Sequence, residues 1–143
     1  MSSRRRGARA RPPVLRSAEA ALAQLYQTAA LNTPAVICLL LDGSRRPLAC
    51  LELGGGADPA AVLDLTDVVL GAAGDEPCLA AVVLATVQGS PPGRDGPELS
   101  CFRQLVEQFD DAGVVLLDWF TIVGDRATSL AALAGVASRW AGP

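Results

Sequence analysis

Residues 79–125 read LAAVVLATVQGSPPGRDGPELSCFRQLVEQFDDAGVVLLDWFTIVGD, and this stretch decides the fold. It begins with the apolar run Leu79–Ala85, which is too continuous for a strand with one solvent-facing side and therefore predicts a central strand. A loop rich in glycine and proline follows over residues 86–97. Glu98–Asp110 then has the apolar spacing of an amphipathic helix, and Val114–Val123 is a second apolar strand. Strand, helix and strand in this order predict an α/β domain.

The flanking segments add a helix, a hairpin and a second helix before this stretch, and one helix after it. Two apolar runs around a glycine-bearing turn are typical of an antiparallel hairpin. Residues that cap helices stand before three apolar segments. The expected elements are a helix from the Ser17 cap to about Leu31, a hairpin of Ala35–Leu41 and Pro47–Leu53, a helix from the Asp58 cap and Pro59 to about Ala72, and a last helix capped by Thr128 or Ser129 that runs to Trp140.

The charge of the chain is unevenly distributed. Its 143 residues carry a net charge of −3, yet residues 1–17 contain no acidic residue and six arginines: Arg4, Arg5, Arg6, Arg9, Arg11 and Arg16. We expect residues 1–17 to be a disordered arginine-rich tail and residues 18–143 to be a single acidic domain. The tail is either a solubilising leader or an arm that contacts phosphates or another anionic partner, as in a nucleic-acid-associated protein. No apolar run reaches the length of a membrane-spanning helix.

The composition also bears on the compartment. All basic residues are arginine, which is typical of a GC-rich genome, and we expect a bacterial source. The four cysteines, Cys38, Cys50, Cys78 and Cys101, show no metal-ligand spacing, and we expect buried, reduced thiols in a cytoplasmic protein. A disulfide between Cys38 and Cys50 across the hairpin is the alternative.

Two motifs in residues 79–125 carry a family resemblance. Leu117-Asp118-Trp119-Phe120 and Ile122-Val123-Gly124-Asp125 match a strand motif that reads Leu-Asp-His-Phe-Ile-Val-Gly-Asp elsewhere. With the preceding strand, loop and helix, the chain resembles the RadC-like branch of the JAMM/MPN (JAB) metallohydrolase family over roughly residues 35–126. The resemblance implies the α–β–α, cytidine-deaminase-like layout, in which helices flank a curved mixed sheet.

The same resemblance implies a zinc site whose ligands this chain lacks. Family members end the first strand in Ala-His-x-His-Pro-Ser-Gly, and two histidines and an aspartate hold the zinc while a glutamate takes a proton from its water. Thr86 and Gln88 stand at the histidine positions, and the chain contains no histidine. Ser90 keeps the serine of this motif. The aspartate position falls on Glu98 if residues are counted back from Leu117-Asp118, and on Leu99 if they are counted forward from Gln88. Trp119 replaces another family histidine, which lies outside the metal triad.

The sequence also bears on the glutamate position and on two other chemistries. Glu52 is the nearest candidate for the glutamate, although it is one residue out of register. A carboxylate cluster of Glu52, Glu98 and Asp118 is an alternative Mg²⁺ or Ca²⁺ site, although no coordination spacing supports it. Ser90 and Cys101 are candidate nucleophiles without a histidine or lysine to act as base.

The loss of the histidines predicts a catalytically inactive domain with no cofactor. Its role would be that of a protein-interaction or scaffold module, with an unknown protein or a second copy as partner. The alternatives are an atypical JAMM-type metallopeptidase or isopeptidase, and a nucleic-acid-associated protein that uses the arginine-rich arm.

Overall fold

The computed structural model describes residues 13–29, 31–89, 96–137 and 139–140. These residues form a five-stranded mixed sheet with the strand order β2-β1-β3-β4-β5. Strands β3 and β4 are parallel, and the other neighbouring strands are antiparallel. Along the chain the elements are α1 (Ala18–Thr28), β1 (Ala35–Leu41), β2 (Pro47–Gly54), α2 (Pro59–Ala73), β3 (Ala81–Val87), α3 (Pro97–Asp111), β4 (Val115–Val123), β5 (Arg126–Ser129) and α4 (Leu130–Ala134).

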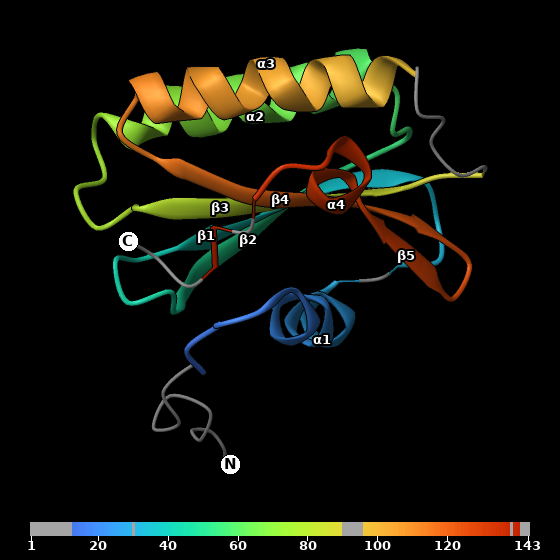
Figure 1. The fold of residues 1–143 in the computed structure, drawn as a ribbon, viewed down its shortest axis with the longest axis horizontal. Coiled ribbons are helices and arrows are strands. Elements are labelled where there is room, and N and C mark those ends of the chain that lie inside the picture. The colour runs from blue at the N-terminus through green and yellow to red at the C-terminus, as the bar shows by residue number, and fades with distance from the viewer. Residues whose placement is uncertain (1–12, 30, 90–95, 138, 141–143) are drawn as a thin grey trace.

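Helices cover both faces of the sheet. Figure 1 shows α2 and α3 side by side over one face, and α1 on the opposite face. Each face has its own apolar cluster: α2, α3 and α4 pack on one, and α1 packs on the other. The expected α/β class, with helices flanking a mixed sheet, is confirmed, and the more specific JAMM/MPN-like layout stays a prediction. No described helix is long and apolar enough to cross a membrane.

Strand β3 is central, as its apolar sequence predicts. It pairs with β1 on one side and β4 on the other, and every residue from Ala81 to Val87 is buried. Its side chains alternate between the two apolar clusters. The strand begins and ends two residues later than expected, so that Thr86 lies inside it rather than in the following loop.

The helix starts follow local capping chemistry. The hydroxyl of Ser17 accepts a hydrogen bond from the backbone N–H of Ala20, and the carboxylate of Asp58 accepts one from Ala61. Pro59 occupies the first turn of α2, where no backbone N–H is needed. Helix α1 ends at Thr28, three residues before the expected end.

The segment after β4 differs from the expected single helix. Residues Arg126–Ser129 form the short edge strand β5, and α4 ends at Ala134 rather than at Trp140. Gly124 turns the chain with a φ of 63°, which lets β5 fold back on the edge of β4, as Figure 1 shows. Gly135, with a φ of 72°, ends α4 in the left-handed conformation typical of a helix C-terminus.

The expected tail boundary at residue 17 is too late. The side chain of Leu15 is only 1% exposed and packs in the α1-side cluster. Its backbone N–H donates to the carbonyl of Arg45 in the β1–β2 turn. An apolar residue in an otherwise polar and basic stretch therefore joins the core. The structure does not describe residues 1–12.

The cysteines form no disulfide among the described residues, which include all four of them. Cys38 belongs to the cluster beneath α2 and α3, whereas Cys50 packs on the α1 side, so the two thiols lie on opposite faces of the hairpin. Cys38 and Cys101 are buried as expected, but Cys78 is exposed because it lies in the turn before β3 rather than in a strand.

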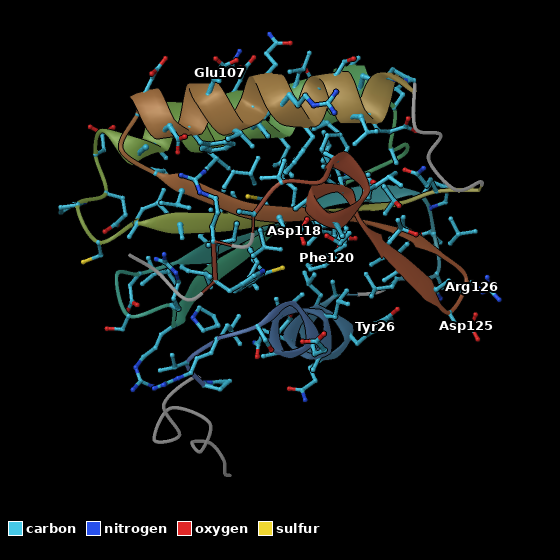
Figure 2. The ribbon with its side chains drawn as sticks, in the orientation of Figure 1. Tyr26, Glu107, Asp118, Phe120, Asp125 and Arg126 are labelled. Atoms are coloured by element: carbon cyan, nitrogen blue, oxygen red, sulfur yellow. The ribbon has the colours of Figure 1, made fainter. Side chains whose placement is uncertain are left out.

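Helix α3 provides a test of the packing. Phe102 is 1% exposed and faces the sheet, whereas Glu107 lies on the outer surface of the same helix, as Figure 2 shows. We expect Phe102→Ala to lower the free energy of unfolding by about 3–5 kcal/mol, since it deletes a buried aromatic ring. Urea denaturation of this variant and of Glu107→Ala checks the expectation, and the second change should stay within about 0.5 kcal/mol of the parent.

Candidate functional site

The candidate site begins with two polar residues at the carboxyl end of the apolar strand β3. Thr86 is completely buried and Gln88 follows two positions later, so their side chains extend from the same face of the strand. The Thr86 hydroxyl donates a hydrogen bond of 3.0 Å to the Gln88 side-chain oxygen Oε1. The backbone N–H of Gln88 donates to the carbonyl of Ile122 on β4, which fixes the chain where it leaves β3. The structure thus brings together Thr86 and Gln88, the two residues at which the resemblance places histidines.

Trp119 of β4 is the third member of this group. It is 1% exposed, and its indole Nε1–H donates a 2.9 Å hydrogen bond to the Thr86 oxygen. Trp119, Thr86 and Gln88 therefore form a chain of hydrogen bonds in which the Thr86 hydroxyl both accepts and donates. We call it the Trp119–Thr86–Gln88 chain. The sequence placed Trp119 outside the metal triad, yet its side chain contacts a position of that triad.

An open hollow of about 340 Å³ lies beside Gln88. Its walls come from the end of β3, the starts of α2 and α3, and the segment before β1: Pro34, Ala57, Asp58, Pro59, Val87, Gln88, Gly89 and Glu98. Glu98 stands in the first turn of α3, where the helix dipole favours a carboxylate. Leu99 instead is 2% exposed and packs in the core. Glu98, and not Leu99, is therefore the residue that shares a hollow with Gln88.

Glu52 does not join this site. On β2 it pairs with Ile37, whose side chain lies in the cluster beneath α1. The residue opposite Val36 on β2 is Leu53, and Val36 is in turn opposite Thr86 on β3. Directly opposed residues in an antiparallel pair share a face, so Leu53 lies on the Thr86 face and Glu52 on the other. The interpretation of Glu52 as the site's glutamate is wrong for this reason.

Asp118 has a structural environment away from the hollow. One carboxylate oxygen accepts hydrogen bonds from the backbone N–H groups of Trp119 and Ala131. The other accepts a 2.6 Å hydrogen bond from the Ser129 hydroxyl. Figure 2 shows Asp118 close to α4, and it lines a separate hollow that Glu19 of α1 and Ala132 of α4 also line. Burial raises the pKa of Asp118, although the three hydrogen bonds to the carboxylate oppose this rise.

The proposed carboxylate cluster therefore does not form. Glu52 lies on the α1 face of β2, Glu98 lines the hollow at the end of β3, and Asp118 bonds to the start of α4. Among the described residues, no group of three or more histidine, cysteine, aspartate or glutamate side chains could hold a metal ion.

The described part of the chain places few of the other candidate residues. Ser90 lies outside the described residues, as do five of the six tail arginines, Arg4, Arg5, Arg6, Arg9 and Arg11. Arg16 is exposed directly before the cap of α1. Cys101 is buried, and burial raises the pKa of its thiol, which favours the unreactive protonated form.

Thr121 is a further buried polar residue that the sequence did not single out. It is 1% exposed and lies opposite Thr86 in the parallel pairing of β3 and β4. Its hydroxyl oxygen has no hydrogen-bond partner among the described residues. A threonine in an apolar strand signals such a position, but only the tertiary structure shows whether the hydroxyl is satisfied.

Comparison of the chain with models of known protein families finds no match, and neither does comparison with curated proteins. The family resemblance of this chain therefore rests on the motifs around β3 and β4.

The two opposed threonines give a matched pair of substitutions. Thr86→Val removes the acceptor of a buried indole N–H, and we expect a loss of about 1–3 kcal/mol in unfolding free energy. Thr121→Val removes a hydroxyl without a partner, and we expect no loss or a gain of up to about 1 kcal/mol. Chemical denaturation of both variants is the measurement. Equal losses would contradict the hydrogen-bond assignment, since the two changes delete the same atoms.

Asp118 gives a pH prediction. A raised pKa means that the native state binds the proton more tightly than the unfolded chain does. The contribution of Asp118 to stability is therefore fully present below its unfolded pKa and is lost as the pH rises through its folded pKa. We expect the native protein to lose stability relative to Asp118→Asn across this interval, as measured by denaturation at several pH values. An NMR titration of Asp118 with a pKa below the ordinary aspartate value would contradict this expectation.

Proposed function

We propose that this protein is a catalytically inactive domain of the RadC-like JAMM/MPN type, which acts by binding another protein or a second copy of itself. The observation that carries the proposal is the Trp119–Thr86–Gln88 chain. At the two positions where the resemblance places zinc-binding histidines, the side chains hydrogen-bond to each other and to a buried indole. The polar groups at this point serve the packing of β3 against β4.

The chemistry of these side chains argues against a zinc-dependent hydrolase. A catalytic zinc site has three protein ligands and one open position for water. Threonine and glutamine offer neutral oxygen atoms, which bind a borderline-soft cation weakly compared with imidazole. The Thr86 hydroxyl is also already engaged with Trp119 and Gln88, and a shift toward a metal would weaken the bond to the buried indole N–H.

Among the described residues, no other group in the hollow replaces the metal. Glu98 and Asp58 are the two carboxylates of its described lining, and Asp58 already caps α2. Glu98 alone offers one possible ligand, and the chain has neither histidine nor lysine to act as general base near neutral pH. What the hollow offers is an open surface between the ends of three secondary-structure elements, which suits binding better than catalysis.

Metal content tests the proposal. We expect the purified full-length chain to contain no stoichiometric zinc by elemental analysis after exposure to excess zinc and desalting. Stoichiometric zinc that resists a mild chelator would overturn the assignment as an inactive domain.

Restoring the family ligands provides the matched control. We expect Thr86→His/Gln88→His to take up zinc, because Glu98 then completes three protein ligands around the hollow. Gln88→His alone changes only the half-buried position and tests whether the fold tolerates the substitution. If the double variant folds and still takes up no more zinc than the parent, the alignment of this hollow with the JAMM/MPN metal site is wrong.

A further inference from the structure

We propose that the hollow beside Asp118 binds a primary ammonium group carried on a short aliphatic stem. This hollow of about 290 Å³ is separate from the one at Gln88, and its assignment does not rest on the proposed function. Its walls come from the start of α1, from β4, and from the segment between the end of β5 and Trp140. The hollow therefore lies where three parts of the chain meet at one edge of the sheet.

A β-bulge in β4 places Asp118 on the α1 side of the sheet. The consecutive β3 residues Val82 and Val83 lie opposite Leu116 and Asp118, so Leu117 is an extra residue in β4. Val83 belongs to the apolar cluster beneath α1. Because a one-residue shift reverses the face of a side chain, the bulge assigns Asp118 to that face. Bulges commonly re-aim a side chain in this way next to a functional site.

The charge of Asp118 is only partly satisfied by its surroundings. Asp118 is 3% exposed, and it is the one buried charged side chain among the described residues. Its hydrogen-bond donors are two backbone N–H groups and the Ser129 hydroxyl, all of which are neutral. Burial nevertheless raises the pKa of Asp118, so these donors do not fully replace the solvation of the carboxylate. A cation in the hollow would supply the opposite charge that a buried carboxylate usually has.

The acceptor positions around the hollow match the three N–H donors of an ammonium group. A carboxylate accepts about four hydrogen bonds. Within the described part of the chain, Asp118 accepts two at Oδ1 and one at Oδ2, which leaves a position at Oδ2. The Ser129 hydroxyl donates to Asp118 and accepts from the N–H of Ala132, which leaves one position on its oxygen. The exposed carboxylate of Glu19, in the first turn of α1, is the third acceptor that lines the hollow.

The same hydrogen bonds disfavour a guanidinium group. A guanidinium pairs with a carboxylate through two parallel bonds, one to each oxygen. Both backbone donors to Asp118 already use Oδ1, so only Oδ2 is open to a ligand. An ammonium is a compact charge that needs a single position on each acceptor. The chemistry of the hollow therefore favours an ammonium.

The remaining walls suit an aliphatic stem. Leu117, Ala131 and Val136 supply apolar surface, and Trp140 supplies an aromatic side chain that packs against the cluster beneath α1. An indole ring also attracts a cation that lies over its face. No basic side chain is among the described lining residues, so none of them competes for the carboxylates.

Titration of the full-length chain with n-butylammonium tests the proposal. We expect saturable binding to a single site by isothermal titration calorimetry, with a change in tryptophan fluorescence that disappears in Trp140→Phe. n-Butanol lacks the charge, tetramethylammonium lacks the N–H donors, and n-butylguanidinium carries the planar fork. Each should bind at least about tenfold more weakly than n-butylammonium, because each loses a charged hydrogen bond or the fit to Oδ2.

Substitutions then locate the site. Asp118→Asn and Glu19→Gln each remove one negative charge from the hollow, and we expect them to raise the dissociation constant of n-butylammonium by about tenfold and about threefold. Glu107→Gln is the matched control, since it removes an exposed carboxylate on the outer surface of α3, and it should leave the dissociation constant unchanged. Circular dichroism establishes that each variant is folded. Because Glu19 is exposed, Glu19→Gln and the ligand series decide the question even if Asp118→Asn does not fold.

A further probe distinguishes the two sources of such a group. Nα-acetyl-lysine N-methylamide carries the ammonium on a lysine side chain flanked by peptide groups. Binding of this probe as tight as that of n-butylammonium would support a lysine of a partner protein as the ligand, whereas binding of n-butylammonium alone would support a small free amine.

Three results would overturn the proposal. They are the absence of saturable n-butylammonium binding, equal affinity for n-butanol, and a dissociation constant that neither Glu19→Gln nor Asp118→Asn changes. None of them alters the zinc content, which tests the loss of catalysis independently.

Discussion

The arrangement of this protein depends on the burial of β3 between two layers of helices and its parallel pairing with β4. Parallel neighbours cannot be joined by a tight turn, so the chain must cross over, and α3 provides the crossover. The crossover begins at the carboxyl end of β3 and must therefore place the start of α3 beside that end. Gln88 and Glu98 share a hollow for this topological reason, although nine residues separate them in the sequence.

A strand buried on both faces limits which polar residues it can hold. The Thr86 hydroxyl is compatible with β3 because it accepts from Trp119 and donates to Gln88 within the protein. A buried polar group without such partners lowers stability, and the opposed Thr121 shows that position alone does not supply them. The same bonds that make Thr86 acceptable in the core engage its hydroxyl as both donor and acceptor within the protein. In our proposal, the residues at this end of the sheet no longer hold a metal and instead join β3 to β4 by hydrogen bonds.

Asp118 has a comparable role for the segment after β4. Neither β5 nor α4 is long enough to be stable by its own hydrogen bonds. The buried carboxylate accepts from Ser129 at the end of β5 and from Ala131 in the first turn of α4. Because Ser129 also caps α4 through the N–H of Ala132, one carboxylate holds both short elements against the central sheet. The three donors offset only part of the cost of burying this carboxylate, because burial still raises the pKa of Asp118.

The sequence by itself determined the elements whose signals are local. Continuous apolar runs predicted β1, β3 and β4, and a 3.6-residue apolar period predicted α2 and α3. Capping side chains predicted the helix starts at Ser17 and Asp58. Each of these signals depends on residues that are only a few positions apart in the sequence. The pairing of Thr86 with Gln88 on one face also follows from strand alternation alone. Short β5 and Leu15 carried no periodic signal and were missed.

Only the tertiary structure decided which side chains meet across elements. The register of β2 against β1 places Glu52 on the sheet face opposite to Thr86. The register of β4 against β3 brings the Trp119 indole to the Thr86 hydroxyl. The fold of the last segment brings Ser129 to Asp118. A shift of one residue in a strand register reverses the face of every side chain, and no local pattern in this sequence fixes such a register. For this reason Thr86 and Gln88 could be singled out from the sequence, whereas the hydrogen bonds that they make could not.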